Sequence, residues 1–287
     1  MLRKRLREKL SGILPQEQIK KVYNSFDVIG DIAIIKHNKV QNAEAVAKQI
    51  MIIHRNIKTV LTPVTHIRGD YRVRKLELLS GEDKTVTAHK ESGCTFKVDV
   101  ENCYFSPRLS YEHSRIANLV RSGETVVNMF AGVGCFSIRI AKTKYQTKVF
   151  SIDINPTAIQ LMKENIKING VCNQVFPLLG DAKDLIQVQL QSIADRVLMP
   201  LPEKALQYLP YALLALKQTG GWIHYYDFQH AYVKENPVEK TKNKVSEKLD
   251  NSGIGYLFAN SRIIRPIGPN WYQTVIDIKI TEMPSKF

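Results

Sequence analysis

Cysteine is scarce in this sequence, and the few cysteines present have no spacing that would make a site. The 287 residues contain four, Cys94, Cys103, Cys135 and Cys172, and no two of them form a C-x-x-C pair. The spacing therefore indicates neither a zinc site nor a disulfide framework, and free thiols are the simpler interpretation. We expect no bound metal.

Long apolar runs are also lacking. No stretch approaches the length that a helix needs to span a bilayer, and the N-terminus has no apolar core of the kind found in signal peptides. These absences argue against a membrane-spanning or secreted protein. A cytoplasmic location is the resulting expectation.

Acidic residues are outnumbered, since 27 Asp and Glu face 41 Lys and Arg and leave a net charge of +14. A polyanionic partner would explain this excess, because Lys and Arg neutralise phosphates when a protein binds nucleic acid. The run Arg3–Arg7 concentrates positive charge near the N-terminus. The competing interpretation is a solvated basic surface that reflects general lysine usage.

The N-terminal part of the chain predicts a small α+β region. The expected elements are helices at Leu2–Leu10 and Gln16–Tyr23, a hairpin within Phe26–Lys36, a helix at Ala43–His54, and short strands between Thr59 and Val98. The hairpin rests on the Gly30-Asp31 turn signal, and Asn42 is placed to cap the following helix. We assign 1–21 to a basic helical segment and 22–106 to an α+β domain that binds RNA or substrate.

From residue 107 onward, strands alternate with helices. The expected elements are a helix through Ile116–Val120, strands at Thr125–Met129, Val149–Ile154, Val171–Leu179, Ala194–Leu198 and Gly221–Phe228, helices at Pro156–Asn169, Glu203–Leu216 and Lys240–Leu249, and final strands at Gly255–Ile264 and Trp271–Ile280. Such alternation predicts an α/β domain over 107–287, a Rossmann-like, doubly wound sheet with its ligand at the carboxyl ends of the strands.

A glycine turn follows the first of these strands. Gly132 and Gly134 allow a tight turn and close approach of the backbone to a ligand. Asp153, at the end of the next strand, can accept hydrogen bonds from ribose hydroxyls, and Asp181 follows the third strand. A dinucleotide motif would need glycine where Ser137 stands. The pattern therefore favours S-adenosylmethionine over NAD, while a turn whose glycines serve packing alone is the other interpretation.

A charged helix precedes the glycine turn. Pro107 can begin it, and the spacing then places Arg108, Glu112 and Arg115 on nearly one face. Ordinary charge pairing along a helix explains the spacing equally well. Its position just before the first strand of the cofactor domain favours a role at the ligand site.

These motifs together resemble the archaeal and eukaryotic tRNA guanine-N1 methyltransferases that modify guanosine-37, beside the anticodon. The resemblance rests on FSPRLSYEHSRI (105–116), NMFAGVGCFSIRIAK (128–142), SIDINP (151–156) and LMPLPEKALQYLP (198–210). It extends upstream to HIRGDYR (66–72) and HKESGCTFKVDV (89–100). The resemblance implies a class I methyltransferase domain behind a smaller N-terminal domain. It also implies S-adenosylmethionine as cofactor and the tRNA anticodon stem-loop as partner.

The resemblance also implies residue roles. Glu112 matches the general base that takes the N1 proton of guanine, Arg72 the cation that stabilises charge on O6, and Arg108 an arginine that orders the site. The cofactor contacts that it implies are Tyr104, His113, Phe130, Gly132, Gly134, Asp153, Ile154, Asp181, Ala182 and Pro200. A helix histidine that faces solvent is the alternative for His113.

Two departures from the family pattern bear on the substrate. Pro200-Leu201-Pro202 stands where Asn-Leu-Pro is usual, as in the archaeal subgroup that also methylates a tricyclic wyosine precursor at position 37. Longer relatives also carry an extra N-terminal domain that grips the outer corner of tRNA. Here only Met1–Lys21 precedes the α+β region, so we expect a short form.

Three alternatives to guanosine-37 methylation stay open. The chain could methylate the wyosine precursor as well or instead. It could be an aminocarboxypropyl transferase of the wyosine pathway, although the resemblance at Arg108 favours methyl transfer, because those enzymes carry a Gly-Asn pair in place of the arginine in the Ser-Pro-Arg triplet. It could also be an inactive tRNA-binding module, against which Glu112 and Arg72 argue.

Overall fold

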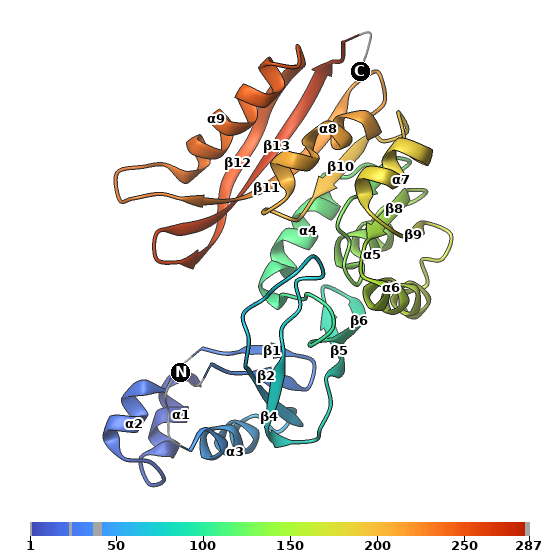
Figure 1. Ribbon diagram of the computed structural model, residues 1–287. Coiled ribbons are helices and arrows are strands. Elements are labelled where there is room, and N and C mark those ends of the chain that lie inside the picture. Colours follow the sequence, from blue (N-terminus) through green and yellow to red (C-terminus); the bar gives the residue numbers. More distant parts are fainter. Residues whose placement is uncertain (1, 23–24, 37–41, 285–287) are drawn as a thin grey trace. The chain divides into compact units, whose positions relative to one another are not determined.

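The computed structural model describes residues 2–22, 25–36 and 42–284, which fall into two compact units, Met1–Ser110 and Tyr111–Phe287 (Figure 1). Each unit has its own elements and core. Within the described ranges, every helix is too short or too polar to cross a bilayer.

The first unit combines helices with two small sheets. Its elements are α1 (Leu2–Leu10), α2 (Gln16–Lys21), β1 (Asp27–Ile29), β2 (Ile32–Ile34), α3 (Ala43–Ile53), β3 (Thr59–Pro63), β4 (Leu76–Gly81), β5 (Val86–Glu91), β6 (Cys94–Asp99) and the 3₁₀ turn η1 (Pro107–Leu109). One sheet has the order β1-β2-β3-β4 and the other pairs β5 with β6. The predicted hairpin and helices are confirmed, while Tyr23, the predicted end of the second helix, lies outside the described residues.

Local chemistry explains these elements. Asn42 accepts a hydrogen bond from the Ala45 N–H and so begins α3 at the predicted residue. Gly30 has a φ of +56°, which the turn between β1 and β2 requires. The core of the unit is formed by apolar side chains of α1, α2, α3, β2 and β3, among them Leu10, Ile19, Ala33, Ile50 and Val60.

The second unit is a mixed seven-stranded sheet with helices. Its elements are α4 (Ser110–Leu119), β7 (Thr125–Asn128), α5 (Cys135–Thr143), β8 (Lys148–Asp153), α6 (Pro156–Asn169), β9 (Val175–Leu179), α7 (Ala182–Gln189), β10 (Arg196–Met199), α8 (Ala205–Ala215), β11 (Gly221–His230), α9 (Pro237–Asp250), β12 (Gly255–Gly268) and β13 (Trp271–Glu282). The strand order is β12-β13-β11-β10-β7-β8-β9. Strands β11 to β9 run parallel, and β13 is antiparallel to both of its neighbours. The predicted Rossmann-like architecture is confirmed.

The final hairpin has an irregular outer strand. Between β12 and β13 the register shifts at four places, and β12 forms one edge of the sheet. Proline occurs in both edge strands, as Pro177 in β9 and Pro266 in β12. This is where proline is tolerated, since its missing N–H removes no bond to a neighbouring strand.

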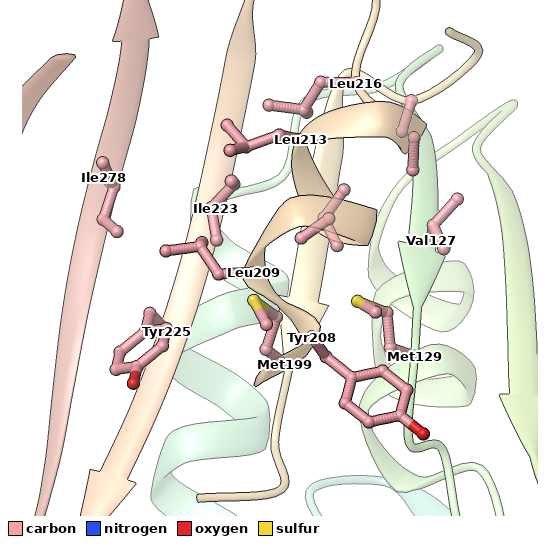
Figure 2. Packing of buried hydrophobic residues seen from close by; sticks show 14 of the residues in the cluster. Val127, Met129, Met199, Tyr208, Leu209, Leu213, Leu216, Ile223, Tyr225 and Ile278 are labelled. Carbon is pink, nitrogen blue, oxygen red and sulfur yellow. The ribbon is translucent and has the colours of Figure 1, made fainter. Parts of the chain in front are cut away.

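The core of the second unit lies between the central strands and the helices that cover them (Figure 2). Met129 follows β7, and Met199 ends the neighbouring strand β10. Leu209 of α8 and Ile223 of β11 pack beside them. All four side chains are buried. Their burial fixes the ends of β7 and β10, where the predicted ligand site begins.

We expect Gly220→Ala to destabilise the second unit far more than Gly123→Ala. Both glycines have left-handed φ values, +81° and +83°, so alanine strains each backbone by about 1 kcal/mol. Only at Gly220 would the new Cβ also meet a backbone oxygen, that of Ile280, at 2.3 Å. That overlap should add about 1–3 kcal/mol.

Urea unfolding followed by tryptophan fluorescence measures this difference. The two tryptophans, Trp222 and Trp271, both lie in the second unit and report on it alone. Equal midpoints for the two variants would contradict the packing argument.

Candidate active site

The glycine turn and Asp153 lie together, as the sequence predicts. The Gly132 N–H donates to Asp153 Oδ2 at 2.6 Å, and the Asn155 N–H donates to Oδ1 at 2.9 Å. Gly134, with a φ of +95°, begins α5, and a Cβ there would meet Met162 Cγ at 2.8 Å. Burial raises the pKa of Asp153, although the Asn155 and Gly132 N–H groups oppose the shift. Each oxygen of this carboxylate keeps acceptor capacity for a ligand hydroxyl.

Asp181 is anchored at the end of the third strand. It caps α7 by accepting the Lys183 N–H at 2.8 Å, and the Tyr208 hydroxyl lies 2.9 Å from each of its oxygens. The Tyr208 ring meets Phe130 edge to face, with centroids 5.1 Å apart. Tyr208 was not predicted, although it lies within the LQYLP part of a quoted motif. The structure thus brings Phe130 and Asp181 together through this ring.

The serine at the missing glycine position has a structural role. Ser137 accepts hydrogen bonds from Asn128 Nδ2 at 3.1 Å and from Ser151 Oγ at 2.7 Å. All three side chains are buried. They connect α5 to β7 and β8 behind the glycine turn.

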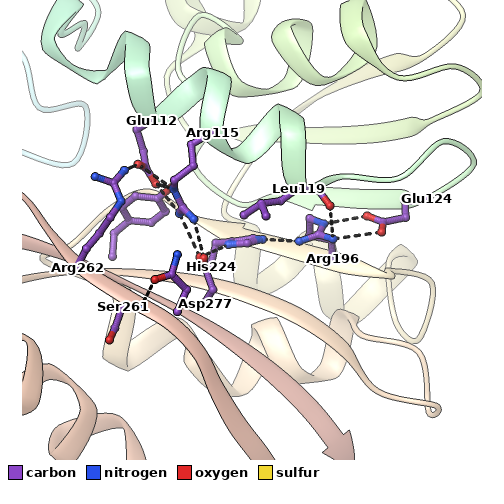
Figure 3. A network of polar contacts seen from close by, with 11 residues as sticks. Glu112, Arg115, Leu119, Glu124, Arg196, His224, Ser261, Arg262 and Asp277 are labelled. Carbon is purple, nitrogen blue, oxygen red and sulfur yellow. Dashed lines mark hydrogen bonds and ion pairs between the residues drawn. The ribbon is translucent and has the colours of Figure 1, made fainter.

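Glu112 is buried in the second unit and its carboxylate is surrounded by donors (Figure 3). Arg115 donates from Nε at 3.0 Å and from Nη2 at 2.7 Å to Oε1, and the Tyr226 hydroxyl donates to the same oxygen at 2.8 Å. Arg262 of β12 donates to Oε2. Burial raises the pKa of Tyr226 far above its usual value, so this phenol stays a donor.

The remaining candidates of the second unit range from buried to exposed. His113 is buried, 4% exposed, and its ring lies edge to face with Phe136 at 4.5 Å, so a solvent-facing histidine is excluded. Ala182 is buried, Pro200 is half-buried and Ile154 is exposed. Ile154 directly follows Asp153 at the end of β8, where an apolar side chain can contact a ligand.

Three candidates belong to the first unit. The Arg72 guanidinium lies over the Tyr104 ring, 4.1 Å from its centroid, and Arg72 has a left-handed φ of 54°. Arg108 Nε donates to Asp27 Oδ1 at 2.8 Å. The predicted helix face of Arg108, Glu112 and Arg115 is therefore only partly correct. Pro107–Leu109 form a 3₁₀ turn, so regular α-helical spacing starts at Ser110 and pairs Glu112 with Arg115 alone.

A polar chain continues from Arg115 across the sheet (Figure 3). Arg115 donates to Asp277 at 2.6 Å, and His224 Nδ1 lies 2.5 Å from the same carboxylate. Burial alone would raise the pKa of Asp277, but His224 and Arg115 bring it well below its usual range. Burial lowers the pKa of His224, and the charge of Arg196 acts in the same direction. These residues were not predicted, because their partners are distant in the sequence.

The sequence matches two domain families. Residues 87–252 match the TRM5/TYW2 methyltransferase domain, and residues 6–85 match the TYW2 N-terminal domain.

Several named proteins are similar along most of the chain. The tRNA (guanine(37)-N(1))-methyltransferase Trm5b of Pyrococcus abyssi is 38% identical over 93% of this chain and 78% of its own length. The tRNA 4-demethylwyosine(37)-methyltransferase Taw21 of Saccharolobus solfataricus is 34% identical over 90% of this chain and 94% of its own. The Methanocaldococcus jannaschii tRNA(Phe) (4-demethylwyosine(37)-C(7)) aminocarboxypropyltransferase is also 34% identical, over 88% and 97%.

Solved structures agree with the fold. The complex of aTrm5 with tRNALeu superposes with a TM-score of 0.82 at 34% identity, over 96% of this chain and 78% of that one. M. jannaschii TYW2 in complex with AdoMet superposes with a TM-score of 0.69 at 29% identity, over 90% and 100%.

We expect the stability of the second unit to fall as pH drops below about 6.5. The pKa of His224 is lowered in the folded state, so on acidification the unfolded chain takes up a proton first. The free energy of unfolding should then decrease by up to about 1.4 kcal/mol per pH unit. His224→Gln should flatten this slope, whatever its effect at pH 8.

Urea midpoints read from tryptophan fluorescence between pH 8 and pH 5 provide the measurement. His113 and His230 are unchanged in both proteins, so they cancel in the comparison. Parallel slopes for the two proteins would rule out His224 as the source.

Proposed function

Because the chain belongs to the TRM5/TYW2 methyltransferase family, we propose that it transfers a methyl group from S-adenosylmethionine to N1 of guanosine-37 in tRNA. The observation that carries the proposal is the buried Glu112 carboxylate, in the same unit as the Gly132–Asp153 turn. Methylation of a protonated ring nitrogen requires a group that accepts its proton and a pocket that binds the nucleoside methyl donor. The similarity to Trm5b over 93% of the chain supports guanosine-37 as the nucleoside that is methylated.

The pocket residues fit this cofactor. Gly132 and Gly134 leave the backbone open to close approach, Asp153 has acceptor capacity for ribose hydroxyls, and Asp181 can accept from an adenine amino group. S-adenosylmethionine supplies an electrophilic methyl group attached to a cationic sulfur. It carries no phosphate, in keeping with a pocket in which Asp153 and Asp181 supply acceptors rather than cations.

Glu112 takes the proton from N1 of guanine in this mechanism. Oε1 accepts from Arg115 Nε, Arg115 Nη2 and Tyr226, whereas Oε2 accepts from Arg115 only through the shared Nε, at 3.1 Å, so we assign Oε2 as the oxygen that turns to the substrate. Arg262 donates to Oε2 and must move away from this oxygen before proton transfer. Its side chain is 29% exposed, which leaves it room to do so. Loss of the N1 proton places negative charge on O6, and we assign its stabilisation to Arg72, with Arg108 ordering the site.

Transfer RNA is the proposed partner, through its anticodon stem-loop. The net charge of +14 suits a polyanion, and a similar protein, aTrm5, has a solved structure in complex with tRNALeu. Its substrate would place the enzyme in the cytoplasm.

Methylation of 4-demethylwyosine-37 is the second candidate. The chain covers 94% of Taw21 and matches the TYW2 N-terminal domain. Pro200 also removes the side-chain amide that the guanosine enzymes usually offer to the base. Pro200→Asn should improve the use of guanosine relative to the tricyclic base if this position selects between them.

A methyl-transfer assay with the purified full chain tests the proposal. With labelled S-adenosylmethionine and a guanosine-37 transcript, we expect N1-methylguanosine, identified by mass spectrometry of the nucleosides. An adenosine-37 transcript should give little product, because adenine carries an amino group where guanine has O6, the atom whose charge we assign to Arg72. Equal labelling of both transcripts would contradict the assignment, and an aminocarboxypropyl product would establish the other transferase reaction.

Glu112→Gln should lower kcat about 10²- to 10⁴-fold, because the amide cannot accept the proton. Cofactor affinity, measured by calorimetry, should stay unchanged. Glu239→Gln is the matched control, since Glu239 is an exposed residue of α9 paired with Lys242. Full activity of Glu112→Gln would remove Glu112 from the mechanism.

A further inference from the structure

The polar chain beyond Glu112 has no part in the reaction described above. Its members come from separate elements: Arg115 from α4, Asp277 from β13, His224 from β11 and Arg196 from β10. Its far end is Glu124, which accepts from Arg196 at 2.8 and 3.1 Å. All of these residues belong to the second unit, and Figure 3 shows them in a row.

Arg115 is the junction between this chain and the proposed base. Its guanidinium donates to Glu112 through Nε and Nη2, and to Asp277 through Nη1 at 2.6 Å and Nη2 at 3.1 Å. A planar fork that is held on two sides has little freedom to rotate. The orientation of the Glu112 carboxylate therefore depends on where Asp277 holds Arg115.

His224 holds Asp277 in turn. The two residues are directly opposite each other on β11 and β13. Arg196 Nη1 lies 2.6 Å from His224 Nε2, and an arginine can only donate, so Nε2 accepts and the ring proton is on Nδ1. That proton is donated to Asp277. One tautomer of a neutral histidine thus satisfies both neighbours.

Charge is balanced along the chain. Three carboxylates (Glu112, Asp277, Glu124) face three guanidinium groups (Arg115, Arg196, Arg262), so their charges cancel while His224 is neutral. His224 is fully buried, and the side chains of Asp277 and Arg196 are 5% and 3% exposed. Buried ion pairs add little net stability compared with apolar packing, whereas they can fix one geometry.

From these contacts we infer that Asp277 and His224 are positioning residues, which act through Arg115 to hold the Glu112 carboxylate in the orientation that methyl transfer needs. The inference rests on the proposed function. Neither residue contacts substrate or cofactor in this role. Their effect on the reaction should therefore disappear when the Arg115 fork is removed.

The test is a double-mutant cycle on the full chain, with kcat and KM for tRNA and for S-adenosylmethionine measured separately. Asp277→Asn replaces one carboxylate oxygen with an amide NH₂, a donor that would face the N–H donors of Arg115 or His224. Arg115→Lys keeps the positive charge but cannot donate to Glu112 and Asp277 from one planar group. Each should lower kcat about 10- to 100-fold. Both KM values should stay within about twofold of the wild type.

The double variant distinguishes positioning from a general loss of structure. If Asp277 acts through Arg115, Asp277→Asn should change the kcat of the Arg115→Lys protein by less than about twofold. Multiplying losses, or an unchanged kcat in either single variant, would overturn the inference. If Asp277→Asn does not fold, as judged by tryptophan fluorescence, His224→Gln replaces it in the cycle.

Asp250→Asn is the charge-matched control, because Asp250 is an exposed residue at the end of α9 whose carboxylate accepts from the Tyr256 hydroxyl, apart from the polar chain. It should retain wild-type kcat. A wild-type protein that makes no N1-methylguanosine would refute the proposed function itself. If only the positioning role is wrong, the wild-type protein makes N1-methylguanosine and the kcat values of the variants alone differ from those expected.

Discussion

The Arg115 guanidinium, shared between the carboxylates of Glu112 and Asp277, is the interaction on which the second unit depends for its geometry. It connects α4, the first helix of that unit, to β13, its last strand. Apolar packing supplies the stability of the sheet, but it is non-directional and does not set the angle of a carboxylate. A fork that donates to two acceptors does, and both acceptors are buried in a region where a misplaced charge is costly.

Elements with strong local signals were predicted from the sequence. Helix α6 was predicted at both ends because Asn155 caps it, Pro156 opens it and Gly170 closes it with a φ of 67°. Helix α7 was missed. That helix is only eight residues long, and Asp181 was interpreted as a ligand contact and not also as its N-cap.

The candidate site was predictable where its residues follow neighbouring parallel strands. Gly132 and Asp153 were placed correctly because a glycine turn and the end of the next strand meet at one edge of a parallel sheet. The donors around Glu112 were not predictable in this way. Tyr226 and Arg262 lie 114 and 150 residues along the chain from it, and pairing at that range depends on the register of β11 and β12. Arg108 was predicted on the same helix face as Glu112, but it lies in a 3₁₀ turn that precedes the regular α-helix. Composition does not reveal where such a turn ends.

The two edges of the large sheet have a consequence for the behaviour of the protein in concentrated solution. An unpaired strand edge is a template for association with other chains, and amyloid-like stacking starts from such edges. Here β9 is short and contains Pro177, while β12 has register shifts and Pro266. Both borders therefore present an interrupted row of donors and acceptors, which protects a basic, open-sheet protein from self-association through its strands.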